Sequence, residues 1–333
     1  MRIPPRALVA LKLLIGVALL ALVLQRVDVS ALSGLTLEKP WLTLALALAL
    51  VVIVLKALRW QSVLRTYFGH RLPYRRSLKV LFIGQAFSLL TPSRAGDFVR
   101  AGYVQPAIGL RKALLSVAIG SLMDGVILLS GGGIAIIVFS EVARSLRLSG
   151  THGAVALLLG FLLIVVLALA WNSSPGAKAR AILKELLDIM ARPLQGKSFL
   201  PAGYQWLLTF VCWVLTTLAS YASARALGLH VEYLPFALLL MLQSVLLLLP
   251  ITVLGLGIRE GTSYALYPLV GIPRELTVPA VWLATFFLSV VPALIGAGFY
   301  LLDGAIRQDI QKQRPRSRTL SEEASPEAGW AGP

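Results

Sequence analysis

Long apolar runs separated by short polar segments form the main pattern of the chain. A helix needs about 20 apolar residues to span the hydrocarbon core of a bilayer. Six segments have this length or come close to it, namely residues 8–24, 41–58, 113–139, 154–171, 204–226 and 279–302. The pattern therefore predicts an all-α integral membrane protein with about six full spans.

Two further apolar segments, residues 78–104 and 234–269, are interrupted in the middle. Proline and glycine break helices, and charged residues follow each break. The helix breaks fall at Pro92 and Gly96 in the first segment and at Pro250, Gly255 and Gly257 in the second. Each segment is either one irregular span or a re-entrant hairpin of two half-helices. Paired broken segments of this kind are typical of a transport site.

The distribution of Lys and Arg helps to decide whether the two interrupted segments cross the bilayer or are re-entrant, because cytoplasmic loops carry an excess of basic residues. If both interrupted segments are re-entrant and the N-terminus lies inside, most of the 31 basic residues fall on the cytoplasmic side. If both segments crossed the bilayer, the basic segment 178–197 would move outside. The charges therefore favour six full spans, two re-entrant elements and both termini in the cytoplasm.

The order of small residues around the two interruptions indicates an internal repeat. Each has a glycine, a proline 22 or 23 residues later, and a further glycine before the next apolar span. These landmarks are Gly69, Pro92 and Gly109 in the first segment and Gly228, Pro250 and Gly271 in the second. Three full spans lie between the two elements, so the elements enter from opposite faces. We therefore predict an inverted repeat, a plan common among transporters.

The composition agrees with a membrane protein. Hydrophobic residues make up 57% of the 333 positions, charged residues 14%, and the mean hydropathy is +0.81. A soluble domain has about a quarter charged residues, so that class is excluded. Cytoplasmic loops account for the net charge of +16, and we expect no nucleic-acid partner. We predict a membrane domain over residues 1–305 and a disordered cytoplasmic tail over residues 306–333.

The sequence gives little support for metal, cofactor or catalytic chemistry. Cys212 is the single cysteine, so it has no intramolecular disulfide partner, and His70, His152 and His230 lie far apart. The glycine run 131–133 follows no strand and lacks the lysine of a nucleotide-binding loop, so it favours close helix packing. We expect no metal, no cofactor and no enzymatic activity, because catalytic spacings of carboxylates or nucleophiles are missing.

Two segments between the spans have interfacial character. Residues 59–79 interleave aromatic side chains with basic ones, which suits the headgroup region of a bilayer. This segment is either a general cytoplasmic anchor or a specific site for lipid. Residues 177–190 put Ile182, Leu186 and Ile189 along one helical face, so we predict an amphipathic helix on the cytoplasmic surface.

Few ionisable residues fall within the apolar segments, and each would be costly in lipid unless paired or hydrated. The acids are Asp97, Asp124 and Glu260, and the bases are Arg100 and Arg259. Asp97 and Arg100 are three residues apart and share one helical face. Arg259 and Glu260 point about 100 degrees apart, so we expect them to have different partners. For Asp124 we expect a pair with Arg100 or Arg94, or a place in a cavity.

These charges have two interpretations. They are internal ion pairs that hold the fold, or they line a central cavity that receives a polar headgroup. In the second case the half-helix N-termini after Gly96 and Gly257 add positive dipole to the site.

Several short motifs resemble a known family. They are the pair Arg59 and Trp60, the set Pro92, Gly96, Asp97 and Arg100, and GLGIREG over residues 255–261. In order and spacing they look like the lysylphosphatidylglycerol synthase transmembrane region, also called the flippase-like domain family, over residues 8–302. The resemblance implies an integral inner-membrane protein of bacterial or archaeal type, with a fold built to move lipids between leaflets.

Two departures from the family pattern bear on function. The bifunctional synthases continue into a large soluble domain that transfers lysine from its tRNA, whereas this sequence ends soon after its last span, so aminoacyl transfer is not expected. The family often has a glutamate and arginine pair ahead of the aspartate that matches Asp124, whereas this chain has Gly120 and Ser121.

The leading hypothesis is a translocator of a membrane lipid, either a phospholipid or a polyprenyl-phosphate lipid. Its substrate-binding residues would be Arg59, Asp97, Arg100, Asp124, Arg259 and Glu260. Arg100 and Arg259 would contact phosphate, and the acids would balance charge. The alternatives are a non-transporting scaffold for envelope-lipid biosynthetic enzymes and a membrane-embedded lipid transferase.

Overall fold

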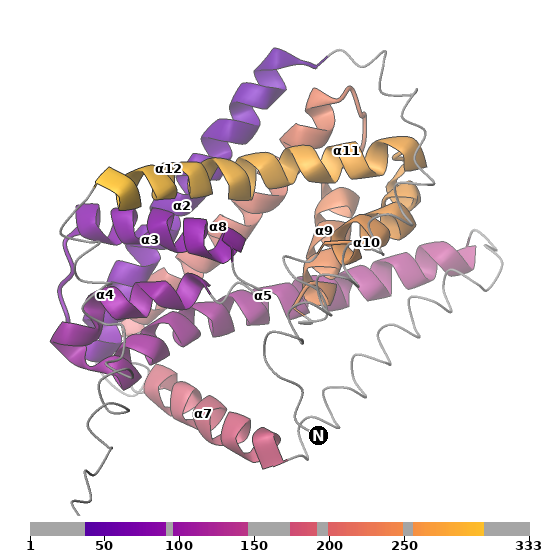
Figure 1. Cartoon of the computed structure of the whole chain (residues 1–333). Helices are drawn as coiled ribbons and strands as arrows, with labels where there is room; N and C mark the ends of the chain where they lie inside the picture. Colours follow the sequence, from indigo (N-terminus) through magenta and orange to yellow (C-terminus); the bar gives the residue numbers. More distant parts are fainter. Residues whose placement is uncertain (1–36, 91–95, 146–173, 192–198, 249–255, 303–333) are drawn as a thin grey trace, which may run out of the picture.

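The computed structural model describes residues 37–90, 96–145, 174–191, 199–248 and 256–302, and the regular structure in these ranges is helical (Figure 1). The longer helices are α2 (Lys39–Phe68), α5 (Leu110–Ser145), α7 (Ser174–Ala191) and α8 (Phe199–Ala226). The shorter ones are α3 (Tyr74–Leu90), α4 (Val99–Ile108), α9 (Tyr233–Leu246), α10 (Ile258–Leu266) and the 3-10 turn η4 (Tyr267–Val270). The last rod consists of α11 (Arg274–Thr285), the π-helical turn η5 (Phe286–Val290) and α12 (Val291–Leu302).

Four helical stretches in the described ranges are long and apolar enough to cross a membrane. They are Lys39–Phe68, Leu110–Phe139, Leu200–Ala226 and Arg274–Leu302, and they confirm the predicted spans 41–58, 113–139, 204–226 and 279–302. The predicted spans 8–24 and 154–171 lie outside the described residues. Large apolar side chains such as Ile137, Leu207 and Leu294 are more than half exposed, as contact with lipid requires.

Helices α2 and α8 pack together at the centre of the bundle and run in opposite directions (Figure 1). At one end the amide of Glu38 donates to Ala226 O at 2.9 Å. Nearer the other end, Gln205 Nε2 donates to Ser62 Oγ at 3.1 Å. Alanines occupy much of the contact, so the two backbones approach closely.

Helices α3 and α4 form an antiparallel hairpin around the first predicted break. A methyl group at Gly96 would overlap the backbone of Phe87, and one at Gly84 would lie 3.2 Å from Arg100 Cγ. Contacts of this pattern require that the chain reverse its direction between the two helices. Pro92 lies outside the described residues, but α3 ends before it and α4 begins after it, as the predicted break requires.

The second predicted break separates α9 from α10. Helix α10 begins after Gly257, whose φ of +77° lies in the region that glycine enters most readily. Pro250 and Gly255 lie outside the described residues. Gly109 and Gly271 have φ angles of +81° and +83°, and each precedes the next long apolar stretch, as the sequence landmarks predict.

Each broken element packs against the last span of the other half of the chain. Helix α3 contacts α12, where a methyl group at Gly296 would overlap the backbone of Phe82. Helix α9 contacts α5, where a methyl group at Gly132 would lie 2.9 Å from Val245 Cγ2. The close packing predicted for the glycine run is confirmed at Gly131 and Gly132, which both face α9.

The helix predicted over residues 177–190 is confirmed as α7. Part of its apolar face is covered by protein instead of lying on the membrane surface. Leu186 and Ile189 are buried against α2, α5 and α8. Ile182 is 53% exposed, in a shallow hollow beside the ion pair of Arg111 with Glu185, whose atoms Nη2 and Oε1 are 2.9 Å apart. The prediction missed this packing because periodicity does not say whether lipid or protein covers an apolar face.

Candidate functional site

Arg59 and Asp124 form a bidentate ion pair between α2 and α5. Arg59 Nη1 lies 2.7 Å from Asp124 Oδ1, and Nη2 lies 2.9 Å from Oδ2. The Arg59 side chain is 7% exposed. Helix α8 completes the arrangement, because Trp213 Nε1 donates to Asp124 Oδ1 at 3.1 Å and Arg59 Nη1 donates to Thr209 Oγ1 at 3.2 Å. The fork of the guanidinium and both carboxylate oxygens are therefore satisfied by three spans.

This geometry corrects the predicted partner of Asp124. The sequence predicted a pair with Arg100 or Arg94, or a place in a cavity. The structure shows a pair with Arg59 instead of Arg100, and the place in a cavity stays a prediction. Arg94 lies outside the described residues. The pair joins positions that are 65 residues apart in the sequence, and it depends on the rotation of α2 and α5 about their axes, which spacing alone does not give. Gly120 lies one turn before Asp124, and a methyl group there would be 3.5 Å from Arg59 Nη2.

Asp97 and Arg100 lie together on one side of the hairpin, as their spacing predicted. Arg100 Nη2 is 3.8 Å from Asp97 Oδ1, and Arg100 Nε donates to the backbone oxygen of Asp97 at 2.9 Å. The side chains are 14% and 26% exposed for Arg100 and Asp97. The carboxylate contact is longer than that of Arg59 with Asp124, so the first ion pair is the tighter one.

Trp60 connects the two pairs. It follows Arg59 on α2, and its ring lies 5.8 Å from the guanidinium carbon of Arg100, a cation–π contact. Its indole nitrogen donates to Ser116 Oγ of α5 at 3.3 Å. We call Arg59, Asp97, Arg100 and Asp124 the first polar cluster; it contains two positive and two negative side chains and is formally neutral.

Glu260 has a capping role at the start of α10. Its Oε2 accepts the backbone N–H of Gly257 at 2.7 Å, and its Oε1 accepts Trp282 Nε1 of α11 at 3.1 Å. The residue is 3% exposed. A carboxylate in the first turn also suits the positive end of the helix dipole. Glu260 thus links the N-terminus of α10, at the second break, to α11 of the following span.

Arg259 belongs to a network with different partners, as predicted. Its Nη1 donates to Thr285 Oγ1 of α11 at 2.8 Å, and its backbone oxygen accepts Gln243 Nε2 of α9 at 2.7 Å. Gln243 is 1% exposed, and its Oε1 accepts the hydroxyl of Tyr267 at 3.0 Å. We call Arg259, Glu260 and Gln243 the second polar cluster, which lies among α9, α10, η4 and α11.

The structure thus places the six predicted site charges in two clusters. Asp97 and Arg100 lie on the 3-10 turn and first residues of α4 just after the first break, and Arg259 and Glu260 lie just after the second. The prediction that both groups line one shared cavity stays a prediction. The hollow beside Arg111 and Glu185 is lined by other residues.

Sequence reasoning missed several polar partners of the site residues, among them Thr209, Trp213, Gln243, Trp282 and Thr285. A signal existed for Gln243, which stands seven residues before Pro250 in an apolar run, as Gln85 stands seven residues before Pro92. The two tryptophans gave no signal, because Trp is common in apolar helices and near membrane interfaces. Within the described part of the chain, no group of three or more His, Cys, Asp or Glu residues could hold a metal ion.

Comparison with known proteins gives one family. A family model described as the lysylphosphatidylglycerol synthase TM region matches residues 9–296. No curated protein matches the sequence.

Proposed function

The chain belongs to the lysylphosphatidylglycerol synthase transmembrane family, and we propose that it translocates a lipid between the leaflets of the cytoplasmic membrane. The translocated headgroup is polar or carries a phosphate, and the acyl or isoprenoid chains stay in lipid. The observation that carries this proposal is the first polar cluster. Four ionisable side chains gather between apolar spans beside a helix break, where an ionisable group indicates function by default.

The two ion pairs of the cluster suit two different roles. Arg59 is held by Asp124 and Thr209 in a nearly closed arrangement, so it fixes the positions of α2, α5 and α8. The contact of Arg100 with the carboxylate of Asp97 is longer, and Asp97 is a quarter exposed. A lipid phosphate would displace the carboxylate of Asp97 from the guanidinium of Arg100. The guanidinium would then exchange a long contact with carboxylate for short, bidentate bonds to phosphate. Asp97 would then be available to a cationic group of the headgroup.

The short helices support re-entrant hairpins at both breaks. Helix α4 has ten residues and so measures about 15 Å, half of the roughly 30 Å hydrocarbon core. Helix α3 runs back along α4, so the hairpin enters and leaves at one end of the bundle. Backbone that is broken at this depth requires protein or water around it, and α5 and α12 supply protein.

The packing pattern supports the inverted repeat. Helix α2 corresponds to α8, the hairpin of α3 and α4 to α9 and α10, and α5 to the rod of α11 and α12. Under this correspondence the contact of α3 with α12 maps onto the contact of α9 with α5, and the contact of α4 with α5 maps onto that of α10 with α11. The antiparallel course of α2 and α8 is the one that an inverted repeat requires.

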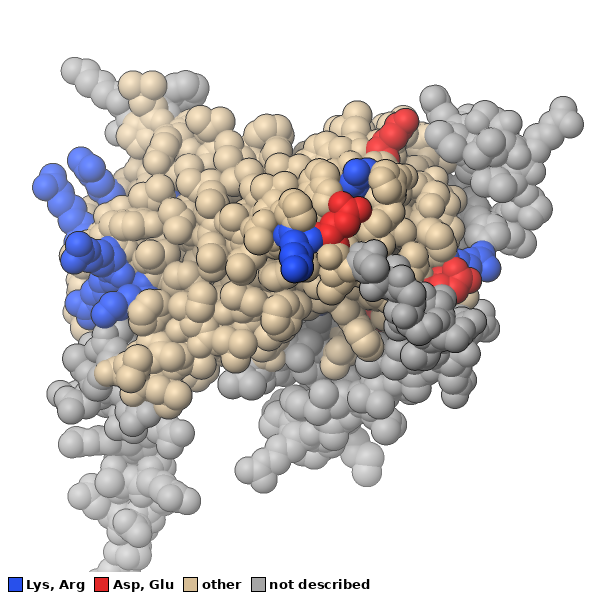
Figure 2. Space-filling view, turned by 90° about the horizontal axis from the view of Figure 1, so that it is seen from above, with Lys and Arg blue, Asp and Glu red and all other residues tan. Residues whose placement is uncertain are grey.

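Charge supports the orientation. Figure 2 shows Lys and Arg gathered at one end of the molecule, the end at which α3 begins and α4 ends in Figure 1. We assign this end to the cytoplasm by the positive-inside rule and propose that both termini lie on that side. The second hairpin then opens toward the outside.

Headgroup translocation in proteoliposomes tests the proposal. The purified chain is reconstituted with quench-accessible anionic, zwitterionic, cationic and polyprenyl-phosphate lipids, and inward movement of each label is followed. We expect one class to flip faster than in protein-free vesicles, and Arg100→Gln to reduce that rate at least tenfold. Arg111→Gln is the matched control, because Arg111 is exposed at the start of α5 outside the cluster. Equal rates with and without folded protein would overturn the proposal.

A scaffold for envelope-lipid biosynthetic enzymes is the second candidate function. It is favoured by Glu260, which caps α10 and bonds to Trp282 as a structural group would. If all six charges are structural, the double variant Asp97→Asn with Arg100→Gln will support lipid assembly in cells as well as the wild type does. Loss of assembly in a folded double variant would favour translocation. We do not propose a transferase, because the charges form ion pairs and caps without a paired acid and nucleophile.

A further inference from the structure

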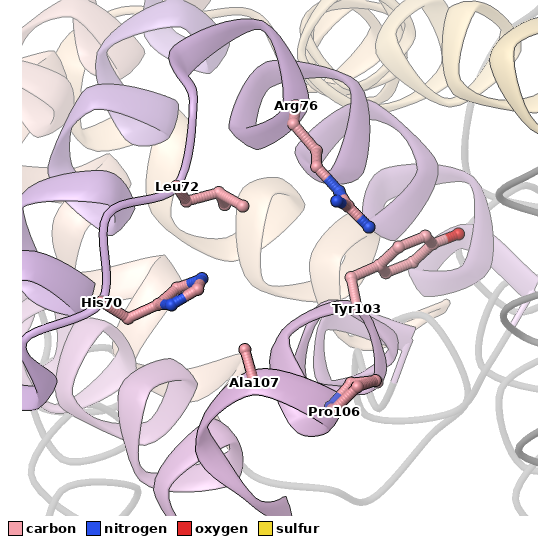
Figure 3. Close-up of a pocket in the computed structure, with 7 residues that line it drawn as sticks. His70, Leu72, Arg76, Tyr103, Pro106 and Ala107 are labelled. Carbon is pink, nitrogen blue, oxygen red and sulfur yellow. The ribbon is translucent and has the colours of Figure 1, made fainter.

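A cavity of about 220 Å³ lies at the basic end of the molecule, outside both polar clusters (Figure 3). Its walls come from the loop after α2, the first turn of α3 and the C-terminal half of α4. The lining residues are His70, Leu72, Arg76, Gly102, Tyr103, Pro106 and Ala107. The volume equals that of roughly seven water molecules at about 30 Å³ each, so a headgroup fits and a whole lipid does not.

The polar lining suits an anion. Figure 3 shows Arg76 reaching down from α3, with its guanidinium beside the ring of Tyr103, and His70 on the opposite wall with one ring nitrogen turned toward the space. A guanidinium presents a fork of N–H groups that matches two phosphate oxygens, and an imidazole N–H adds a further donor. None of the seven lining residues is acidic.

The surroundings add positive potential. Arg71 and Arg75 are exposed beside the cavity. Among the described residues from 56 to 112 the one acid is Asp97, and it already faces Arg100. The blue side chains at the left end of Figure 2 stand without red ones among them in that view. An anionic leaflet attracts basic residues at its surface, so this end favours anionic lipid.

The aromatic residues next to the cavity suit a position at headgroup depth. Tyr67, Phe68 and Tyr74 flank it in the sequence and are partly buried, as aromatic residues at a membrane interface are. Leu72 supplies an apolar wall. Pro106 and Ala107 are exposed on α4, so the opening leaves room for acyl chains beside the helix.

We propose that this cavity binds the phosphate group of an anionic lipid, with Arg76 and His70 donating to its oxygens and the acyl chains remaining in the adjacent leaflet. The site is an equilibrium binding site and does not require that the protein move lipid. It is distinct from the first polar cluster, although Tyr103 follows Arg100 by one turn of α4. A bound lipid would therefore hold α4 of the hairpin in place.

Lipid retention by the purified full chain in detergent, measured by native mass spectrometry, tests the proposal. Phosphatidylglycerol and phosphatidylcholine of equal chain length are titrated separately. We expect one phosphatidylglycerol molecule to bind saturably, and phosphatidylcholine at least tenfold more weakly. Arg76→Gln should weaken phosphatidylglycerol binding at least tenfold. Arg75→Gln removes the same charge from the next residue of α3, which does not line the cavity, and should change binding less than twofold.

Two results would overturn the site as a whole, and a third would overturn the role of His70. Equal losses for Arg75→Gln and Arg76→Gln would indicate a general basic anchor. Displacement of the lipid by millimolar inorganic phosphate would assign the cavity to free phosphate. Unchanged binding in His70→Gln, a loop substitution outside any helix, would remove His70 from the site and provides a second test if Arg76→Gln does not fold. Binding is measured in detergent, without vesicles. Absence of lipid binding in this test therefore leaves the translocation proposal standing, and absence of translocation in proteoliposomes leaves the lipid site standing.

Discussion

Arg59 is enclosed by three spans, and its guanidinium makes both strong bonds to the carboxylate of Asp124. Removal of one partner of such a pair leaves a charge in a medium that solvates it poorly, which destabilises a protein by about 3–5 kcal/mol. Removal of both charges, with the shapes kept, is far less harmful. The pair is therefore best tested by comparing single and double neutral variants.

We expect Arg59→Gln to lower the free energy of unfolding by about 3–5 kcal/mol, because Asp124 then keeps only the bond from Trp213. The double variant with Asp124→Asn should recover more than half of this loss, because the amides of the two new side chains can bond to each other. Thermal unfolding of the purified protein in detergent measures both values. A double variant as unstable as the sum of the singles would show that the two residues act independently.

Spacing in the sequence predicted some residue contacts and not others. Asp97 and Arg100 belong to one helical turn, so their common face follows from helix geometry alone. The partners of Asp124 and Glu260 lie on other helices, at positions fixed by how those helices are rotated and packed. The sequence also could not decide whether Glu260 forms an ion pair or caps a helix. The capping bond depends on the turn that the backbone of Gly257 adopts in the structure.

At the scale of elements, the broken hairpin depends on how closely α3 and α4 approach. Gly96 lies against the backbone of Phe87 and Ser88, so no side chain can move aside to make room for a methyl group. Overpacking of this kind typically destabilises by about 1–3 kcal/mol. The hairpin also carries Asp97 and Arg100, so a shift of the turn would displace both charges.

We expect Gly96→Ala to lower the unfolding temperature and to reduce lipid movement, because the turn must move away from α3. Gly133→Ala is the matched control, since a methyl group there meets nothing within 4 Å and alanine favours the helix by about 0.5–1 kcal/mol. Thermal unfolding and the proteoliposome assay provide the two readouts. Equal stability of the two variants would mean that the hairpin tolerates separation of α3 from α4.

The apolar runs predicted the described spans well, because a bilayer fixes both the length and the character of a crossing helix. The breaks were also predictable, since proline and glycine interrupt helices through their own covalent structure. The packing of α7 was not predictable. Leu186 and Ile189 would look the same in the sequence whether lipid or the ends of α2, α5 and α8 covered them.

At the scale of the whole molecule, the two broken elements and the basic charge together constrain the topology. Re-entrant hairpins place the two ends of each element on the same side of the membrane, whereas crossing elements place them on opposite sides. Arg71 and Arg111 flank the first element, and His230 and Arg274 flank the second. All four are exposed and lie outside the buried clusters, so cysteine can replace them with little effect on packing.

Labelling of single cysteines in intact and permeabilised cells distinguishes these topologies. In a Cys212→Ser background, we expect a membrane-impermeant maleimide to label Arg71→Cys and Arg111→Cys only after permeabilisation. His230→Cys and Arg274→Cys should be labelled in intact cells, because the second hairpin opens to the outside in an inverted repeat. Labelling of Arg71→Cys and Arg111→Cys from opposite sides would mean that the first element crosses the bilayer. The cluster around Arg100 would then lie on a full span, and the two halves would no longer be related by inversion.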